Sequence, residues 1–297
     1  MRLFFMLFTV KFMSFSDQLK VISQYLFPQH AVSVAAGKLA EVRAPWFKNW
    51  FITKFAKAYQ IDMSNAVEPE LTNYACFNDF FTRAIKPESR PIDTDPQALC
   101  SPVDGAMSQF GKIENGRIIQ AKNHHYSALE LLAGDQEMAS QFDDGEFCTI
   151  YLAPKDYHRI HMPCDGKLLS MTHIPGKLFS VNPLTAENVP NLFARNERVV
   201  SYFETPFGLM AMVAVGATIV GSVETVWHGN VTPPTRKDIV SWSYHDQSIN
   251  LAKGEEMGRF KLGSTVVLLL QNSNWAWKSA MQNGDSLQLG EKLIAKQ

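Results

Sequence analysis

Beyond about residue 100 the sequence consists mostly of short apolar runs separated by Gly, Pro, Asn and Asp. This texture is typical of antiparallel β-structure, in which short strands are joined by polar turns. The N-terminal stretch has a different pattern, which favours helices. Together the two patterns predict an α+β protein: a helical N-terminal region, residues 1–65, is followed by a mostly antiparallel, β-rich domain, residues 66–297.

One uncharged stretch, residues 208–223, raises the question of a transmembrane helix. Its glycines and β-branched residues, with Glu224 directly after it, favour two consecutive buried strands instead. The apolar run Met1–Val10 is too short to span a bilayer. Lys11 interrupts it and no small-residue cleavage site follows closely, so a signal peptide is not indicated either. The sequence assigns no role to residues 1–13.

The N-terminal region is basic. Through residue 60 it has eight Lys or Arg against two acids, Asp17 and Glu41. Ser16 is placed to cap one helix, and Pro45 suits the first turn of another.

The helix after Pro45 is predicted to be amphipathic, with Lys48 and Lys57 flanking an apolar stripe and Lys54 inside it. The stripe consists of Phe47, Trp50, Phe51, Phe55 and Ala58. Such a stripe can face the interface of an anionic membrane or the protein's own core. The basic excess favours the first, so we expect residues 1–65 to dock on a membrane without spanning it.

The segment Leu262-Gly-Ser-Thr265 lies where a glycine-rich polar stretch passes into an apolar run that predicts a buried strand, Thr265–Leu270. Gly263 tolerates a strained turn that would bring the Ser264 hydroxyl close to the carbonyl carbon of Gly263. Attack there converts the peptide bond into an ester, and elimination of that ester leaves a pyruvoyl group at residue 264. An ordinary β-turn accounts for the same four residues.

Two further segments carry groups suited to assist that attack. Ser101–Gly105 places Asp104 in a tight turn, and Tyr151–Pro163 supplies His158 and His161. With the segment around Ser264 they resemble the phosphatidylserine decarboxylase family, specifically its bacterial membrane-associated branch. The likeness extends to residues 77–83, 179–182, 191–198 and 215–222. The order and spacing of these strings make the resemblance specific.

The resemblance implies self-cleavage between Gly263 and Ser264, with Ser264 as nucleophile, His161 as base and Asp104 as the carboxylate that orients His161. The products are a large chain, 1–263, and a small chain, 264–297, which stay together as a heterodimer. His158 is implied to transfer protons during decarboxylation, or else to stabilise the wall of the site. On a straight strand His158 and His161 would point to opposite faces, so a bend or turn is required.

The implied reaction is the decarboxylation of phosphatidylserine to phosphatidylethanolamine through a Schiff base with the pyruvoyl group of Ser264. Pyruvate, as this covalent group, is the implied cofactor, and neither a metal nor a diffusible cofactor is implied. Phe179, Ser180 and Asn182 are implied to line the headgroup pocket. A diacyl substrate implies a peripheral enzyme on the cytoplasmic face of the cell membrane, and the oligomeric state stays open.

Composition narrows the alternatives. A formal net charge of -1 indicates no basic field for nucleic acid. The four cysteines lack the spacing of a metal site and are typical of reduced thiols. Two alternatives remain: a serine hydrolase that uses Asp104, His161 and Ser264 without cleavage, and a non-enzymatic, membrane-bound β-domain. The hydrolase lacks a G-x-S-x-G elbow.

Overall fold

A computed structural model describes residues 14–26, 28–121, 124–218, 222–232, 238–261, 264–272 and 274–296. The helices are α1 (Phe15–Leu26), α2 (Gln29–Ala40), α3 (Pro45–Ala58), α4 (Phe77–Phe81), α5 (Ala128–Leu131), α6 (Gln136–Ser140), α7 (Pro183–Asn188) and α8 (Leu192–Arg195), with 3-10 turns η1 (Leu71–Asn73) and η2 (Pro87–Ser89).

The strands in the first half of the sheets are β1 (Ala98–Cys100), β2 (Gly105–Lys112), β3 (Arg117–Ala121), β4 (His124–Ser127), β5 (Glu146–Leu152), β6 (Arg159–His161), β7 (Gly166–Ile174), β8 (Arg198–Thr205) and β9 (Gly208–Val215). The remaining strands are β10 (Ser222–Thr225), β11 (Gly229–Asn230), β12 (Val240–Ser243), β13 (Asn250–Leu251), β14 (Glu256–Lys261), β15 (Ser264–Leu270), β16 (Trp275–Trp277), β17 (Ser286–Leu287) and β18 (Lys292–Lys296).

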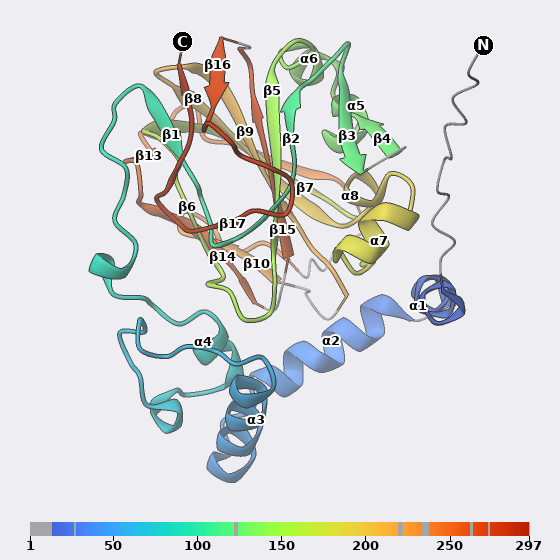
Figure 1. Cartoon of the computed structure of the whole chain (residues 1–297), viewed down its shortest axis with the longest axis vertical. Helices are drawn as coiled ribbons and strands as arrows, with labels where there is room; N and C mark the ends of the chain where they lie inside the picture. Colours follow the sequence, from blue (N-terminus) through green and yellow to red (C-terminus); the bar gives the residue numbers. More distant parts are fainter. Residues whose placement is uncertain are drawn as a thin grey trace, which may run out of the picture.

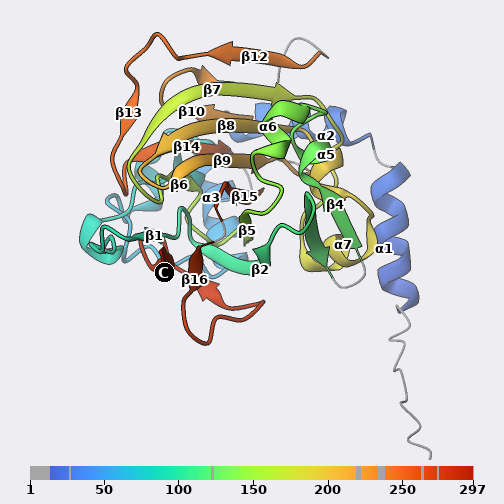
Figure 2. The same cartoon turned by 90° about the horizontal axis from the view of Figure 1, so that it is seen from above.

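A nine-stranded sheet forms the centre of the β-domain, in the order β12-β7-β8-β9-β15-β5-β2-β17, with β13 also paired to β7 (Figure 2). Smaller sheets have the orders β11-β10-β14-β6 and β1-β18-β16, and β3 pairs with β4. All of these strand pairs are antiparallel. The predicted α+β class, with helices first and antiparallel strands after, is therefore confirmed.

Strand β15 lies at the middle of this sheet, between β5 and β9. Its seven residues are all buried, so the predicted buried strand is confirmed. Val266, Leu268 and Leu270 point into a core shared with the smaller sheets. Val267 and Leu269 point into a second core, which the β3–β4 hairpin and the short helices cover. From Val266 to Leu270 the strand is apolar because both of its faces are buried.

The helices α1, α2 and α3 lie outside the β-domain and follow one another along one end of it (Figure 1). Pro45 is the first residue of α3, as predicted. The prediction for α1 is corrected: the helix begins at Phe15, and the Ser14 hydroxyl accepts the N–H of Asp17 at 3.1 Å. Ser14, rather than Ser16, is therefore the capping residue.

The orientation of α3 also differs from the prediction. Its buried residues are Lys48, Ile52 and Ala56, and Phe51 and Phe55 of the predicted stripe pack against the aromatic core of α4. Lys48 is buried because its ammonium donates to the carbonyl of Thr72 at 2.8 Å, which a helical-wheel argument does not include.

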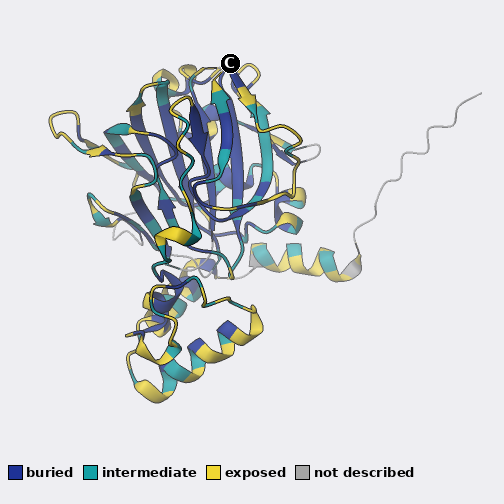
Figure 3. Cartoon of the chain, turned by 60° about the vertical axis from the view of Figure 1, so that its left-hand side comes forward, coloured by how far each residue is buried: buried dark blue, intermediate teal, exposed yellow. Residues whose placement is uncertain are grey.

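Much of the helical region is exposed, as the yellow parts of its ribbon in Figure 3 show, and several of the exposed residues are apolar. Trp46 is 78% exposed and Trp50 is 57% exposed. Leu19, Ile22, Tyr25, Val34 and Leu39 are also exposed. The apolar surface of this region thus includes α1 and α2 as well as α3.

Within the described residues, no helix has the length and apolar character needed to cross a bilayer. The stretch 208–223 forms β9 and begins β10, so its assignment to two strands is confirmed where it is described. Residues 1–13 and 219–221 lie outside the described residues.

Candidate active site

Asp104 and Ser264 lie at the same end of the nine-stranded sheet. Asp104 directly precedes β2, and Ser264 is the first residue of β15. Strand β5 lies between these two strands and ends at Leu152, which pairs with Ser264. Because β5 runs antiparallel to both β2 and β15, its last residue lies beside their first residues. Asp104 and Ser264, which are far apart in the sequence, therefore lie at the same end of the sheet.

Both candidate histidines follow β5. A turn at residues 154–156 reverses the chain, so that His158 directly precedes β6 and His161 ends it. The N–H of His161 donates to the carbonyl of Pro102 at 2.8 Å, which brings β6 next to the turn that carries Asp104. Strand β14 pairs with β6 and leads into β15.

Ser264 is 1% exposed, and its hydroxyl finds no hydrogen-bond partner among the described residues. Buried hydroxyls are normally paired, since an unpaired one loses its bonds to water without replacement. The buried hydroxyls of Thr149 and Thr265 are also unpaired among the described residues, so what distinguishes Ser264 is its place at the start of the central strand, directly after the predicted cleavage point. Leu262 and Gly263, the other half of the predicted cleavage site, lie outside the described residues.

Asp104 is held by a group that the sequence did not indicate. Its two carboxylate oxygens accept from Nε and Nη2 of Arg90 at 2.8 and 2.7 Å. The N–H of Leu289 donates to the same carboxylate at 2.8 Å. This bidentate pair with a further donor fixes the position and orientation of the carboxylate.

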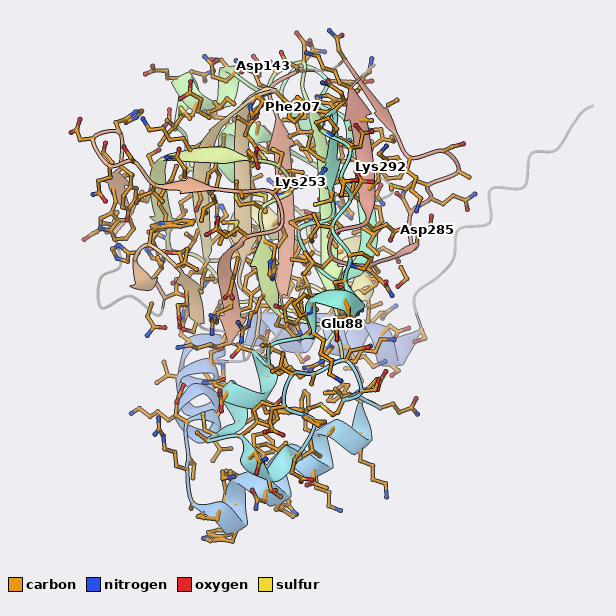
Figure 4. The ribbon with its side chains drawn as sticks, turned by 90° about the vertical axis from the view of Figure 1, so that its left-hand side faces the viewer. Glu88, Asp143, Phe207, Lys253, Asp285 and Lys292 are labelled. Atoms are coloured by element: carbon orange, nitrogen blue, oxygen red, sulfur yellow. The ribbon has the colours of Figure 1, made fainter. Side chains whose placement is uncertain are left out.

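The segment that carries Arg90 is itself fastened to the β-domain. The ammonium of Lys253 donates to the carbonyls of Asp95 and Ala98 at 2.9 Å each, and Lys292 pairs with the Asp95 carboxylate at 2.6 Å. Figure 4 shows Lys253 and Lys292 beside the sheets, and Glu88 where this segment meets the helical region. These contacts set the place from which Arg90 reaches Asp104.

His161 is a neutral ring with a defined tautomer. Its Nδ1 lies 2.8 Å from the carbonyl of Gly254, which can only accept, so Nδ1 carries the hydrogen. Nε2 is then an acceptor and lies 3.1 Å from the hydroxyl of Tyr157. Burial lowers the pKa of His161, opposed by the Gly254 carbonyl, then by the charge of Glu256 and least by that of Asp104, while the charge of Arg159 adds to the lowering. The ring is chemically suited to be a base at Nε2.

In this structure the carbonyl of Gly254, rather than the Asp104 carboxylate, holds the Nδ1 hydrogen of His161. Asp104 acts on the ring through its charge. A direct Asp104–His161 bond would require the carboxylate or the ring to change partners, as catalytic hydrogen bonds often tighten only in the reacting complex.

His158 has different surroundings. It is fully buried, its ring stacks on Phe81 with centroids 4.0 Å apart, and Nε2 donates to the carbonyl of Ala153 at 3.1 Å. Nδ1 has no partner among the described residues. Burial, followed by the charge of Arg83, lowers the pKa of His158 to about 3. His158 is therefore neutral at physiological pH, with a free acceptor at Nδ1.

A cavity of about 560 Å³ opens between α2 and the sheet that contains β10 and β14. Its lining residues include Lys38 of α2, Glu41 directly after α2, Asn78 of α4 and Lys261 at the end of β14. Lys261 stands three residues before Ser264 in the sequence, whereas Ser264 itself is not among the lining residues.

The three residues predicted to line the headgroup pocket lie nearer to α1. The ring of Phe179 packs edge-on against Tyr25 at 5.1 Å, and the N–H of Ser180 donates to Gln24 at 3.0 Å. Asn182 caps α7 through a bond from the N–H of Thr185 at 3.0 Å. Phe179 lines a second cavity, of about 320 Å³, under α1. The larger cavity is lined instead by the neighbouring Leu178.

Comparison with known proteins decides the family. A family model described as "Phosphatidylserine decarboxylase" matches residues 77–295, and a second, described as "PSD", matches residues 19–60. The chain belongs to the phosphatidylserine decarboxylase family. It is therefore an enzyme, a decarboxylase, and the non-enzymatic alternative is wrong.

Several relatives of this family align over most of their length. The phosphatidylserine decarboxylase proenzyme of Methylobacillus flagellatus is 63% identical over 246 residues, which are 83% of this chain and 87% of that protein. The proenzyme of Hahella chejuensis is 54% identical over 281 residues, 95% of each chain. That of Pseudomonas entomophila is 56% identical over 280 residues, covering 93% of this chain and 97% of the relative.

Sequence reasoning proposed Asp104, His161 and Ser264 as the reactive groups of this decarboxylase, but it did not find the residues that support them. Arg90, Tyr157 and the Gly254 carbonyl hold Asp104 and His161 in the structure. Tyr157 stands four residues before His161, and its proximity could have been suspected from a turn. A backbone carbonyl more than ninety residues along the chain leaves no signal in the sequence.

Proposed function

We propose that the chain cleaves itself between Gly263 and Ser264 and then decarboxylates phosphatidylserine to phosphatidylethanolamine. The observation that carries this proposal is the buried, unpaired hydroxyl of Ser264 at the start of β15, in a chain of this family. The resulting chains, 1–263 and 264–297, remain together because β15 keeps its backbone bonds to β5 and β9.

In the proposed cleavage, Nε2 of His161 takes the proton of Ser264 as the hydroxyl oxygen bonds to the carbonyl carbon of Gly263. The amide nitrogen of Ser264 receives a proton and leaves as an amine, which gives an ester. Loss of the Cα proton of Ser264 expels the Gly263 carboxylate and leaves a dehydroalanine. Water then adds to its imine tautomer, ammonia leaves, and a pyruvoyl group remains at residue 264.

Asp104 supports this step by stabilising the imidazolium that forms at His161. Arg90 holds the Asp104 carboxylate in place, while the Gly254 carbonyl holds the hydrogen on Nδ1 and so leaves the lone pair of His161 on Nε2. The Tyr157 hydroxyl, which donates to Nε2 in this structure, must turn away for the Ser264 hydroxyl to take its place. The site at Ser264 fits the pyruvoyl group, since the hydroxyl from which it is made has no competing partner among the described residues. Once formed, this group supplies a ketone that condenses with the serine amine as a Schiff base and withdraws electrons as carbon dioxide leaves.

We propose that the serine headgroup enters the 560 Å³ cavity beside Lys261. Lys38 offers an ammonium to the phosphate. Neutral His158 accepts a proton at Nδ1 and can return it later in the reaction. The headgroup role assigned to Phe179, Ser180 and Asn182 is then at most indirect, through the loop that carries Leu178.

A membrane position follows from the substrate, because a diacyl lipid stays in the bilayer. Exposed Trp46 and Trp50, with the apolar side chains of α1 and α2, suit an interfacial position for residues 1–65. The four free cysteines suit the reducing cytoplasmic side.

The decisive experiment is Ser264→Ala, with Ser201→Ala as a control that removes an equally buried hydroxyl from β8. The wild type and the control should yield two chains, the smaller one blocked at its N-terminus, and should decarboxylate phosphatidylserine. Ser264→Ala should stay a single inactive chain by intact mass. Cleavage of Ser264→Ala at the same bond would overturn the proposal, and an active, uncleaved wild type would favour the serine hydrolase.

A further inference from the structure

Three consecutive residues, the last of α4 and the two that follow it, hold the turn that carries His158. The ring of Phe81 stacks on the His158 ring, with centroids 4.0 Å apart and planes 22° from parallel. The carbonyl of Thr82 accepts from Nε of Arg159 at 2.8 Å. Nη2 of Arg83 donates to the carbonyls of Lys155 at 3.2 Å and of Asp156 at 3.5 Å.

These contacts reach the turn from both of its ends. Arg83 bonds to residues before His158, and Thr82 bonds to the residue directly after it. Phe81 restrains the histidine ring itself. A ring that stacks on one face and donates from Nε2 has little rotational freedom, so the direction of Nδ1 is set by this segment.

The segment is in turn packed against helix α3. Rings stack in an unbroken row from Trp50 to Phe51 (6.5 Å), Phe51 to Phe77 (4.4 Å), Phe77 to Phe81 (5.8 Å) and Phe81 to His158 (4.0 Å). The planes of each successive pair lie within 22–27° of parallel. The row begins at the half-exposed Trp50 of α3 and ends at a fully buried histidine.

The charges around His158 affect how easily its ring is protonated. Arg83 is the charged side chain that acts on His158, and Asp104, Asp156 and Tyr157 act in turn on Arg83. Arg83 is 5% exposed and makes no ion pair within the described ranges. A buried, unpaired cation beside the ring disfavours protonation of His158.

We propose that Phe81 and Arg83 are positioning residues for decarboxylation: they aim Nδ1 of His158 and keep the ring neutral. Through the row of stacked rings, the orientation of His158 depends on the packing of α3. This proposal rests on the proton-transfer role proposed for His158. Among the described residues neither Phe81 nor Arg83 hydrogen-bonds to Asp104, His161 or Ser264, and Arg83 interacts with Asp104 only through its charge. Self-cleavage should therefore proceed in variants of both residues.

The test compares Phe81→Leu with Phe142→Leu. The second variant removes an equally buried ring from the core that the β3–β4 hairpin covers. Both variants should mature into two chains. Phe81→Leu should lower kcat roughly ten- to hundredfold with little change in KM, because a misaimed group loses effective concentration. It should also move the acid limb of kcat/KM to higher pH, since a less buried His158 is protonated more easily. Phe142→Leu should leave kcat and the acid limb in place.

Arg83 provides a second pair that does not depend on the fate of Phe81→Leu. Arg83→Met removes the cation and should also raise the acid limb, whereas Arg83→Lys keeps the charge and should hold the limb close to wild type. Equal limbs for Arg83→Met and Arg83→Lys, or equal kcat for Phe81→Leu and Phe142→Leu, would overturn the proposal. His158→Gln distinguishes the proton-transfer role of His158 from its positioning by Phe81 and Arg83. Normal turnover by His158→Gln would refute the proton-transfer role. Impaired turnover in His158→Gln, but not in the Phe81 and Arg83 variants, would refute the positioning role alone.

Discussion

Strand β15 and helix α3 are both rich in apolar residues, yet they meet opposite environments. Each residue of β15 is buried, with strands on both sides and a core on each face. On α3, Trp46 and Trp50 are mostly exposed although Ile52 and Ala56 on the opposite side are buried. Other strands and the two cores of this chain cover β15 on all sides, whereas α3 presents apolar surface that the described chain leaves exposed.

This contrast separates two tasks. The β-domain holds Ser264 and Asp104 at one end of the nine-stranded sheet, and His161 on the neighbouring strand β6, by contacts from the β-domain and the segment leading into it. The proposed self-processing should therefore need nothing from outside. The helices supply apolar and basic surface, which suits access to a lipid. The row of rings from Trp50 to His158 is where the two regions meet.

The largest expected effect is on the rate of self-cleavage in the β-domain. His161→Ala should slow self-cleavage by about 10²–10⁴-fold, since a positioned base contributes that much. Cleavage of purified precursor is followed on a denaturing gel, with and without lipid vesicles. The wild-type rate should be the same in both. Maturation of His161→Ala at the wild-type rate would refute its role as base, and a lipid requirement in the wild type would break the comparison.

A stability experiment sharpens the contrast between strand and helix. In the single-chain Ser264→Ala background, Leu268→Ala should reduce the free energy of unfolding by about 2–5 kcal/mol, because Leu268 is fully buried in the core. Leu39→Ala on α2, where Leu39 is 46% exposed, should cost about 0.5 kcal/mol or less. Urea denaturation measures both. Similar losses would mean that α2 is as tightly packed as β15.

Acid should weaken the β-domain through its buried histidines. The pKa of His158 is about 3 in the folded chain against an ordinary value of 6.5, and that of His161 is also lowered. Between these values the unfolded chain binds more protons, so stability falls as pH decreases from 6.5 towards 3. The slope is at most about 1.4 kcal/mol per pH unit for each histidine.

His158→Gln, measured by urea denaturation at several pH values, should show a shallower decline than its parent, because glutamine cannot take up this proton. Both chains carry Ser264→Ala so that cleavage does not complicate unfolding. Parallel declines would show that His158 is not the group responsible.

The smallest effect is expected on the helices. Trp46→Ser with Trp50→Ser should leave self-cleavage unchanged and weaken binding to anionic vesicles about tenfold, through loss of buried aromatic surface. Val226→Ser, which alters an exposed apolar residue of the β-domain, should bind like wild type. Vesicle co-sedimentation measures both, and added salt should weaken only the electrostatic part. Wild-type binding by the double variant would place the membrane contact elsewhere.

The elements that the sequence predicted well are those with local causes. Pro45 opens α3 because its ring has the dihedral angle of a first helical residue. The run after Ser264 forms a buried strand because β-branched residues pack well in sheets. The cap of α1 was misplaced because Ser14 and Ser16 are equivalent by residue type, and the start of the helix decides between them.

The sequence by itself determined the order of helices and strands, the family, and the identity of the reactive candidates Asp104, His161 and Ser264. Tertiary structure alone decided what surrounds them: Arg90 on Asp104, the Gly254 carbonyl on His161 and Phe81 on His158. It also decided that Lys48 is buried and Trp50 exposed. The physical reason is the separation along the chain over which each effect acts. Helix and strand propensities and turn chemistry act over a few residues, whereas the hydrogen-bond and packing partners of a buried group come from any part of the chain that the sheets bring close to it.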